Sequence, residues 1–251
     1  MVEERDVEFI RAFWTRPSNV TYVIFAFNIV LFILMQLAGG STNDYTLLAF
    51  GAKSNYEINH GEYWRLVSPV FLHIGPIHII FNSIAIWVVG PQVEKLYGAA
   101  RFTIIYVLCG IGGVLGSYWA HPEPQALSAG ASGAIFGLFG ALLVFGFKYR
   151  SSIPAVFQKA AGRGVLPVIA INLFIGYVIP HIDNSAHIAG LITGALLAAI
   201  IPFQRPGTET PNVFKFLQAA MVVVVILSFY EVAVHYRGPA ISFRNLYQLV
   251  E

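Results

Sequence analysis

The sequence has little charge and almost no cysteine, and each shortage excludes a class of protein. Only 11% of its residues are charged and 57% are hydrophobic, whereas a soluble domain carries about 25% charged residues. A soluble fold of this length cannot hide so much apolar surface. The single cysteine, Cys109, rules out an intramolecular disulfide and a CxxC metal site. We expect it to be a small buried apolar residue.

Long stretches without any charged residue divide the chain. A helix needs about 20 apolar residues to cross a hydrocarbon core about 30 Å thick, and several stretches reach that length. The stretches cover 17–43, 66–93, 102–122, 124–147, 165–182, 184–204 and 216–230. The last is the weakest, because Glu231 interrupts it. We therefore predict an all-α polytopic membrane protein with six core helices and one appended C-terminal transmembrane helix.

This pattern predicts three regions. A short cytoplasmic segment covers residues 1–18, the six-helix core covers 19–204, and residues 205–251 hold a linker, the seventh helix and an external tail. The mixed-charge start and the long first apolar stretch do not fit a cleavable signal peptide. The first helix is therefore expected to remain as an anchor.

Lysine and arginine are distributed unevenly between the two predicted membrane faces. One face holds only Lys53, Arg65, Arg237 and Arg244, and the rest of the 15 basic residues fall on the other. Cytoplasmic loops carry the excess of basic residues, so we predict a cytoplasmic N-terminus, in a multi-pass protein of a prokaryotic inner membrane. The basic residues lie scattered at membrane edges, so nucleic acid is not an expected partner.

Few polar residues fall inside the predicted spans, and such residues usually face the protein interior and mark a site. His78 and Asn82 are four residues apart, so they share one face of the second span. Ser132 begins the fourth span and His187 lies near the start of the sixth. These three spans are predicted to run in the same direction, from outside to inside. Their polar residues can therefore meet near the external face.

These residue types suit acyl transfer. A serine hydroxyl needs a general base within hydrogen-bond reach, and His187 is the candidate base for Ser132. The oxyanion that forms needs hydrogen-bond donors, which His78, Asn82 and the backbone N–H of Ser132 could supply. Taken singly, a membrane serine usually bonds back to a carbonyl of its own helix, and a lone histidine often only packs. Their combination on three helices favours a catalytic site.

Glycines surround the candidate serine and recur on the helices concerned. Gly130 and Gly133 flank the serine, where they would permit a tight helix start and the close approach of a substrate backbone. Gly133 with Gly137, and Gly190 with Gly194, are spaced four residues apart, which is a pattern that lets helices pack closely in lipid. The spacing alone is nonspecific, because many bundles have it.

The remaining ionisable residues near these spans have other expected roles. Asp183 lies four residues before His187, but it stands at a helix start, where an N-cap is commoner than a third catalytic group. Four further histidines lie at predicted external edges, and we expect them to be interfacial rather than catalytic: His73, His121, His181 and His235.

The motifs resemble those of rhomboid intramembrane serine proteases over residues 20–203. The matching residues are Trp64 and Arg65 in the first external loop, His78 and Asn82 in span two, Gly130 to Gly133 around the serine, and Ala186, His187, Gly190 and Gly194 in span six. The seventh span is similar to the extra C-terminal helix of some members. The resemblance implies proteolysis of transmembrane protein substrates, in contact with membrane lipid and without any metal or organic cofactor.

The resemblance also implies roles for single residues. Ser132 and His187 would form a catalytic dyad, with His78 and Asn82 as oxyanion donors. Trp64 and Arg65 would stabilise the first loop, and Glu94 matches a structural position at the cytoplasmic end of span two. Phe136 stands where some relatives have a tyrosine that stacks on the catalytic histidine. Phenylalanine keeps this stacking and loses the hydroxyl.

Two other functions fit parts of the sequence. A catalytically inactive rhomboid-like binder of membrane proteins would typically lack one of the dyad residues, whereas both Ser132 and His187 are present. A transporter could use the membrane histidines as a proton relay. It would leave the glycine-flanked serine unexplained, and its transport would survive Ser132→Ala.

Overall fold

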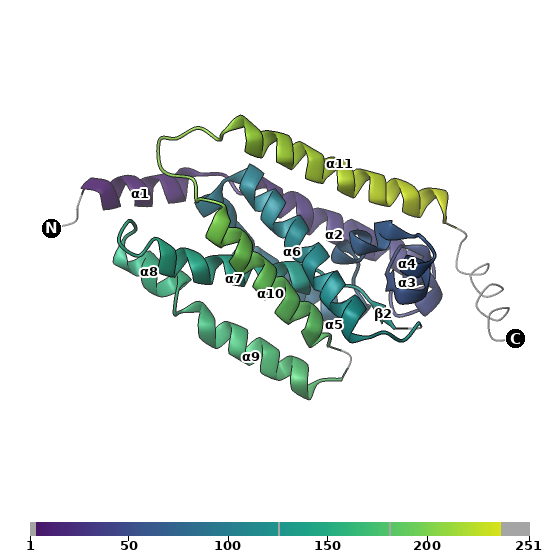
Figure 1. Cartoon of the computed structure of the whole chain (residues 1–251). Coiled ribbons are helices and arrows are strands. Elements are labelled where there is room, and N and C mark those ends of the chain that lie inside the picture. Colours follow the sequence, from purple (N-terminus) through teal and green to yellow (C-terminus); the bar gives the residue numbers. More distant parts are fainter. Residues whose placement is uncertain (1–3, 125, 181, 237–251) are drawn as a thin grey trace, which may run out of the picture.

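The computed structural model describes residues 4–124, 126–180 and 182–236, which form a helical bundle (Figure 1). Arg237, Arg244 and His181 lie outside the described residues. The helices are α1 (Glu4–Thr15), α2 (Asn19–Leu37), α3 (Asp44–Ala49), α4 (Asn55–Asn59), α5 (Gly75–Tyr97), α6 (Ala99–Ala120), α7 (Ser132–Lys148), α8 (Ala155–Ala161), α9 (Val165–Val178), α10 (Asn184–Ile200) and α11 (Asn212–Val234). Two 3₁₀ turns, η1 (Tyr63–Leu66) and η2 (Ser68–Phe71), and two short strands, β1 (Lys53–Ser54) and β2 (Leu127–Ser128), complete the described elements.

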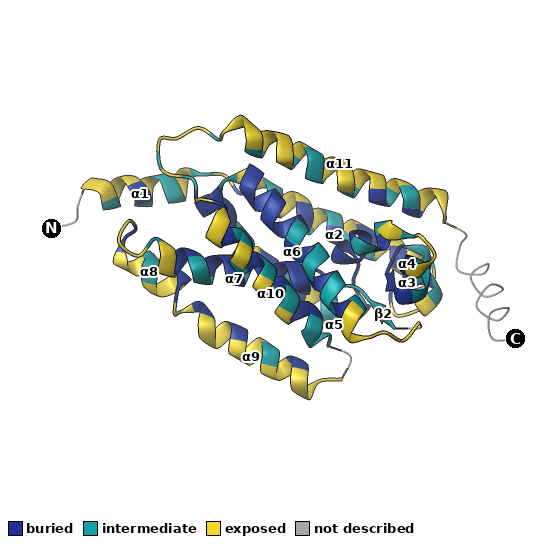
Figure 2. Ribbon diagram, in the orientation of Figure 1, coloured by how far each residue is buried: buried dark blue, intermediate teal, exposed yellow. Residues whose placement is uncertain are grey.

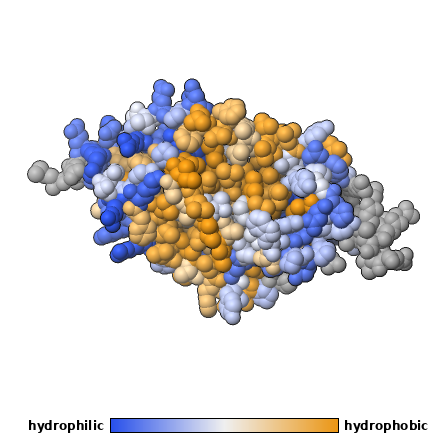
Figure 3. Space-filling model, in the orientation of Figure 1, coloured by the Kyte–Doolittle hydropathy of each residue, from blue (hydrophilic) through white to orange (hydrophobic). Residues whose placement is uncertain are grey.

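The bundle has the surface of a membrane protein. In Figure 3 a broad apolar belt separates two hydrophilic ends. Within the described part of the chain, five helical segments are long and apolar enough to cross a bilayer, and α7 and α10 are shorter apolar helices. The predicted all-α multi-pass bundle with six core helices and one C-terminal helix is confirmed.

Helix α6 lies at the centre of the bundle. Its side chains Phe102, Ile105 and Tyr106 are fully buried, and it contacts α7, α10 and α11. Figure 2 shows α6 and α7 largely buried, whereas most of α9 and α11 is exposed. The exposed side chains of these outer helices are almost all apolar, as expected where lipid replaces water as the solvent.

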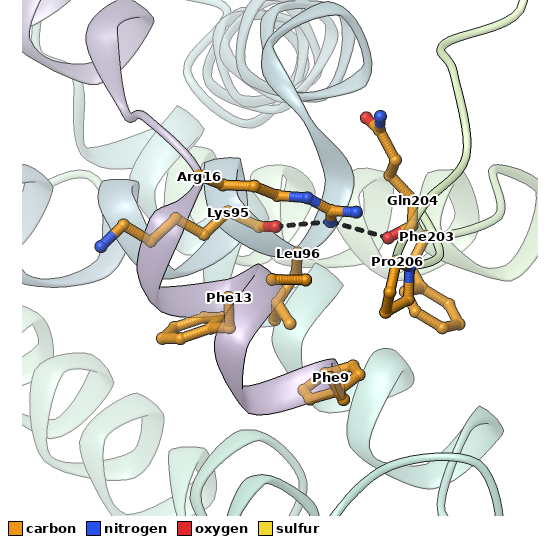
Figure 4. Close-up of a pocket in the computed structure, with 9 residues that line it drawn as sticks. Phe9, Phe13, Arg16, Lys95, Leu96, Phe203, Gln204 and Pro206 are labelled. Atoms are coloured by element: carbon orange, nitrogen blue, oxygen red, sulfur yellow. Dashed lines mark hydrogen bonds between the residues drawn. The ribbon is translucent and has the colours of Figure 1, made fainter. Parts of the chain in front are cut away.

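Charged residues tie the N-terminal end of the bundle together. The Arg16 guanidinium, in the turn between α1 and α2, donates hydrogen bonds to the carbonyls of Lys95 (3.0 Å) and Gln204 (2.7 Å), as Figure 4 shows. The buried Glu94 carboxylate accepts from the backbone N–H of Val20 (3.0 Å) and Thr21 (2.7 Å). Both N–H groups stand at the start of α2, where a negative charge stabilises a helix. Glu94 therefore has the geometry of a structural residue.

The opposite end carries α3, α4 and the strands, and we call it the loop end. Strand β1 pairs with β2 in antiparallel register, Lys53 opposite Ser128 and Ser54 opposite Leu127. This small sheet joins the first loop, residues 38–74, to the loop between α6 and α7. The Arg65 guanidinium holds the first loop from inside, because it donates to the carbonyls of Leu48 and Ala52, both at 2.9 Å.

Candidate active site

Ser132 is the first residue of α7, and the backbone before it has a glycine-only shape. Gly130 has a φ of +144°, which side-chain-bearing residues rarely adopt. Its N–H donates to the carbonyl of Pro69 at 2.9 Å, so the segment before the serine is held by the first loop. A Cβ at Gly130 would also lie 2.8 Å from Nε2 of His78. The sequence signal of a glycine-flanked serine therefore has a steric cause.

Glycines bring α7 and α10 into backbone contact beside the serine. A Cβ added at Gly190 would clash with the backbone of Gly133, and one at Gly194 with that of Gly137. One turn into α7, the Phe136 ring stacks on the His187 ring, with centroids 4.2 Å apart and planes 10° from parallel. His187 is only 7% exposed. The packing thus sets Ser132 and His187 on adjoining first turns of two touching helices.

The hydrogen bonds of His187 determine which ring nitrogen is free. Nδ1 lies 3.2 Å from Oδ1 of Asn184, and an amide oxygen only accepts, so Nδ1 carries the proton. Asn184 is itself fixed, because its Nδ2 donates to the carbonyl of Leu173 in α9 at 3.1 Å. Nε2 then has a free lone pair, as a general base requires. Among the described residues His187 bonds Asn184 rather than Ser132, and catalytic hydrogen bonds are often long before substrate binds.

His78 has the opposite tautomer. Its Nδ1 accepts from the N–H of Ile74 at 3.3 Å, so Nε2 carries the proton and can donate. This nitrogen lies beside Gly130, because a Cβ added at Gly130 would stand 2.8 Å from it and 3.7 Å from Oγ of Ser132. Asn82, which is 6% exposed, donates one N–H to the His78 carbonyl at 2.9 Å. The second N–H of its amide bonds no other described residue and can donate to another acceptor.

Asp183 caps α10, as its position in the sequence suggested. Its carboxylate accepts from the N–H of Ala186 at 3.1 Å and from the hydroxyl of Ser185, and it lies 3.4 Å from Nε2 of His121. Burial alone raises the pKa of Asp183, but these hydrogen bonds outweigh it and hold the pKa below its ordinary value. The side chain is thus committed to the helix start rather than to Nδ1 of His187.

The structure corrects one expectation and adds one residue. His73 was expected at the interface, yet it is only 1% exposed and lies edge-on to His78 with ring centroids 5.4 Å apart. Asn184 was not singled out as a partner of His187. Its position three residues earlier, one turn up the same helix face, was the available signal. Among the described residues no group of three or more His, Cys, Asp or Glu is placed to hold a metal ion.

Comparison with known proteins agrees with the motifs. Residues 60–203 match the sequence profile of the Rhomboid domain. The chain is 40% identical over 233 residues to the Rhomboid protease GluP of Bacillus subtilis (strain 168), covering 93% of this chain and 44% of GluP. It is 35% identical over 144 residues to the Putative rhomboid protease YdcA of the same strain, covering 57% of this chain and 70% of YdcA.

A third relative extends the match to a different organism. The Rhomboid protease AarA of Providencia stuartii is 26% identical over 231 residues, which cover 84% of this chain and 82% of AarA. The chain spans less than half the length of GluP. The domain match covers more than half of the chain and contains every residue of the site described above. The chain therefore belongs to the rhomboid family.

Proposed function

We propose that this protein is an intramembrane serine endopeptidase that hydrolyses peptide bonds in or near the transmembrane segments of membrane proteins. The observation that carries the proposal is the pair of hydrogen bonds that assign opposite tautomers to the two histidine rings. His187 has a free lone pair at Nε2, where a base is needed, and His78 has an N–H at Nε2, where a donor is needed. Relatives named rhomboid proteases support the same reaction.

In the proposed reaction Ser132 and His187 act as a dyad. Oγ of Ser132 attacks the carbonyl carbon while Nε2 of His187 takes the hydroxyl proton. The oxyanion is stabilised by Nε2–H of His78, the free amide N–H of Asn82 and the backbone N–H of Ser132. Collapse breaks the C–N bond as His187 returns the proton to the leaving amine. Water, deprotonated by His187, then hydrolyses the acyl-enzyme and regenerates the serine.

The remaining predicted residues support the proposed site. Gly133, Gly190 and Gly194 let the backbones of α7 and α10 touch. Phe136 stacks on the His187 ring and fixes its orientation. Trp64, Arg65 and Glu94 stabilise the surrounding scaffold. The catalytic core would be residues 19–204, with residues 1–18 cytoplasmic and 205–251 contributing the seventh helix.

The proposed site lies below the outer membrane surface. Helix α7 has 17 residues, which at 1.5 Å each give about 25 Å, short of the roughly 30 Å of hydrocarbon. The basic residues of the N-terminal end favour a cytoplasmic position for it. Ser132 would then open toward the external, periplasmic side of an inner membrane, in contact with lipid and with transmembrane substrates.

Cleavage of a reference transmembrane substrate by purified protein in liposomes tests the proposal. We expect Ser132→Ala and His187→Ala each to lower the cleavage rate by about 10⁶-fold, to below detection, as for other serine nucleophiles. Ser152→Ala, at an exposed serine in the loop after α7, should cleave normally. Activity that survives Ser132→Ala would overturn the dyad. A wild-type protein that binds but never cleaves the substrate would favour the inactive binder instead.

A further inference from the structure

Helix α11 packs against α6 and is otherwise largely exposed. Of its residues only Ser228 and Val232 are buried. Near its start the Phe214 ring packs against the Arg101 guanidinium, 4.2 Å from ring centroid to Cζ. Near its end it contacts η1 and η2 of the first loop. A helix that only anchored the chain in the membrane would need no specific contact with the first loop.

Three side chains at the end of α11 meet the first loop. The His235 ring stacks on Trp64, with centroids 4.6 Å apart and planes 26° from parallel. The Tyr236 ring stands edge-on to Phe50 at 5.8 Å. The Val232 side chain closes over Gly51, where an added Cβ would lie 2.6 Å from Val232 Cγ2.

The His235 ring is fixed from its own helix. Nδ1 donates to the carbonyl of Glu231 at 2.9 Å, and it lies 3.4 Å from the Glu231 carboxylate. Glu231 is the charge that interrupts the seventh apolar stretch. A charge at this place is costly for a span, and here it orients the ring that faces Trp64.

The first loop carries these contacts to the backbone before Ser132. The Ser68 hydroxyl donates to the carbonyl of Gly51 at 2.6 Å and also lies 3.1 Å from the carbonyl of Trp64. Gly51 and Trp64 are two of the first-loop residues that the end of α11 contacts. The neighbouring carbonyl of Pro69 accepts the N–H of Gly130 at 2.9 Å. A continuous set of packed groups therefore runs from His235 through η1 and η2 to the segment that places the serine.

We propose that α11 braces the first loop and that His235 is a positioning residue for Ser132, acting through Trp64, Ser68 and Pro69. This deepens the proposed function and rests on it. The aromatic stack holds the loop, and the loop holds Gly130. Loss of the stack makes the backbone beside the oxyanion donors more mobile. It leaves the binding of a transmembrane segment unchanged. The effect therefore falls on kcat and not on KM.

The test compares His235→Ala, which removes the stack, with His235→Phe, which keeps a ring. Val234→Ala is the matched control, because Val234 is the preceding residue and is 58% exposed. An aromatic pair of this kind corresponds to about a two- to tenfold change. We expect His235→Ala to lower kcat and the rate of fluorophosphonate labelling of Ser132 by that factor, with KM unchanged. His235→Phe should restore most of the loss, and His235→Ala added to Trp64→Leu should cost nothing more.

Hydrogen exchange of residues 60–72 separates this proposal from the proposed function. Exchange should speed up in His235→Ala and not in Val234→Ala. If the loop loosens while wild-type protein cleaves no substrate, the brace stands and the protease assignment fails. If His235→Ala matches Val234→Ala in exchange, kcat and labelling, the brace is wrong even though the protease assignment stands. A loss that His235→Phe does not rescue also contradicts the role of the stack.

Discussion

Helices α10 and α11 both pack against α6, but they do so in different ways. Helix α10 reaches α7 through glycines, with backbone against backbone at Gly133 and Gly190. Helix α11 reaches the bundle through large rings, such as Phe229, which lies 5.1 Å from Phe27 and 5.9 Å from Phe71. A glycine contact has no side chain that can adjust its length. A ring contact can shift by rotamer changes and still bury its surface.

This difference separates two tasks. The α7–α10 contact sets the positions of Ser132 and His187, and in the dyad proposed above a displacement of about 1 Å would cost about 100-fold in rate. The α11 contact holds a loop that acts on the site through several residues. Substitutions in the α7–α10 interface should therefore lower the cleavage rate severely. Substitutions in the α11 interface should lower it by smaller and varying factors.

The largest effect is expected from Gly190→Val. The added side chain has no room against the backbone of Gly133, so α7 and α10 must separate or the protein must not fold. We expect no cleavage and a lower thermal unfolding midpoint in detergent. Ala199→Val, on an exposed position of the same helix, is the control. Normal cleavage by Gly190→Val would show that the α7–α10 interface tolerates added bulk, which contradicts its proposed role in fixing the site.

The second effect concerns the partner of the base. Asn184→Ala removes the acceptor of Nδ1 of His187 and leaves the glycine contact intact. Because the ring loses its anchor, we expect kcat to fall by about 10- to 100-fold with little change in the unfolding midpoint. Asn172→Ala in α9, whose amide donates within its own helix to the carbonyl of Val168, should cleave like wild type. Equal cleavage rates for the two variants would show that Asn184 does not position His187.

Features of the fold and of the candidate site could be predicted from the sequence where they depend on residues close together in the chain. Uncharged stretches gave the spans, because crossing a bilayer is a local requirement of length and polarity. The motif around Ser132 and the spacing of His78 and Asn82 indicated the candidate site, because each is a pattern within one short segment. The pairing of β1 with β2 was not predicted, since strands of two residues have no periodicity to detect.

Contacts between residues far apart along the chain could not be predicted from the sequence. The tautomers of His187 and His78 depend on hydrogen-bond partners, and only the fold shows that Leu173 fixes Asn184. His73 was expected at the interface because it lies near the external edge of the predicted second span. It lies instead at the end of the first loop, packed beside His78 and 1% exposed. The Trp64–His235 stack joins residues 171 positions apart, for which one sequence carries no signal.

The smallest effect is a pH dependence at the start of α10. The folded-state pKa of Asp183 lies below its ordinary value, so the ionised carboxylate stabilises the fold above the unfolded pKa of about 4. This stability is lost as pH falls from there through the folded pKa. We expect Asp183→Asn, which still caps the helix, to flatten the acid decline of the unfolding midpoint. Identical declines in both proteins would show that Asp183 does not contribute.

We propose that α7 and α10 place the Ser132 hydroxyl within reach of His187, which acts as its general base. Fluorophosphonate labelling followed by peptide mass spectrometry tests this most directly, without any substrate. We expect one adduct, on Ser132, that forms in wild-type protein and is lost in His187→Ala, although that variant unfolds at the same temperature. An adduct on another serine, or equal labelling of Ser132 with and without His187, would contradict it.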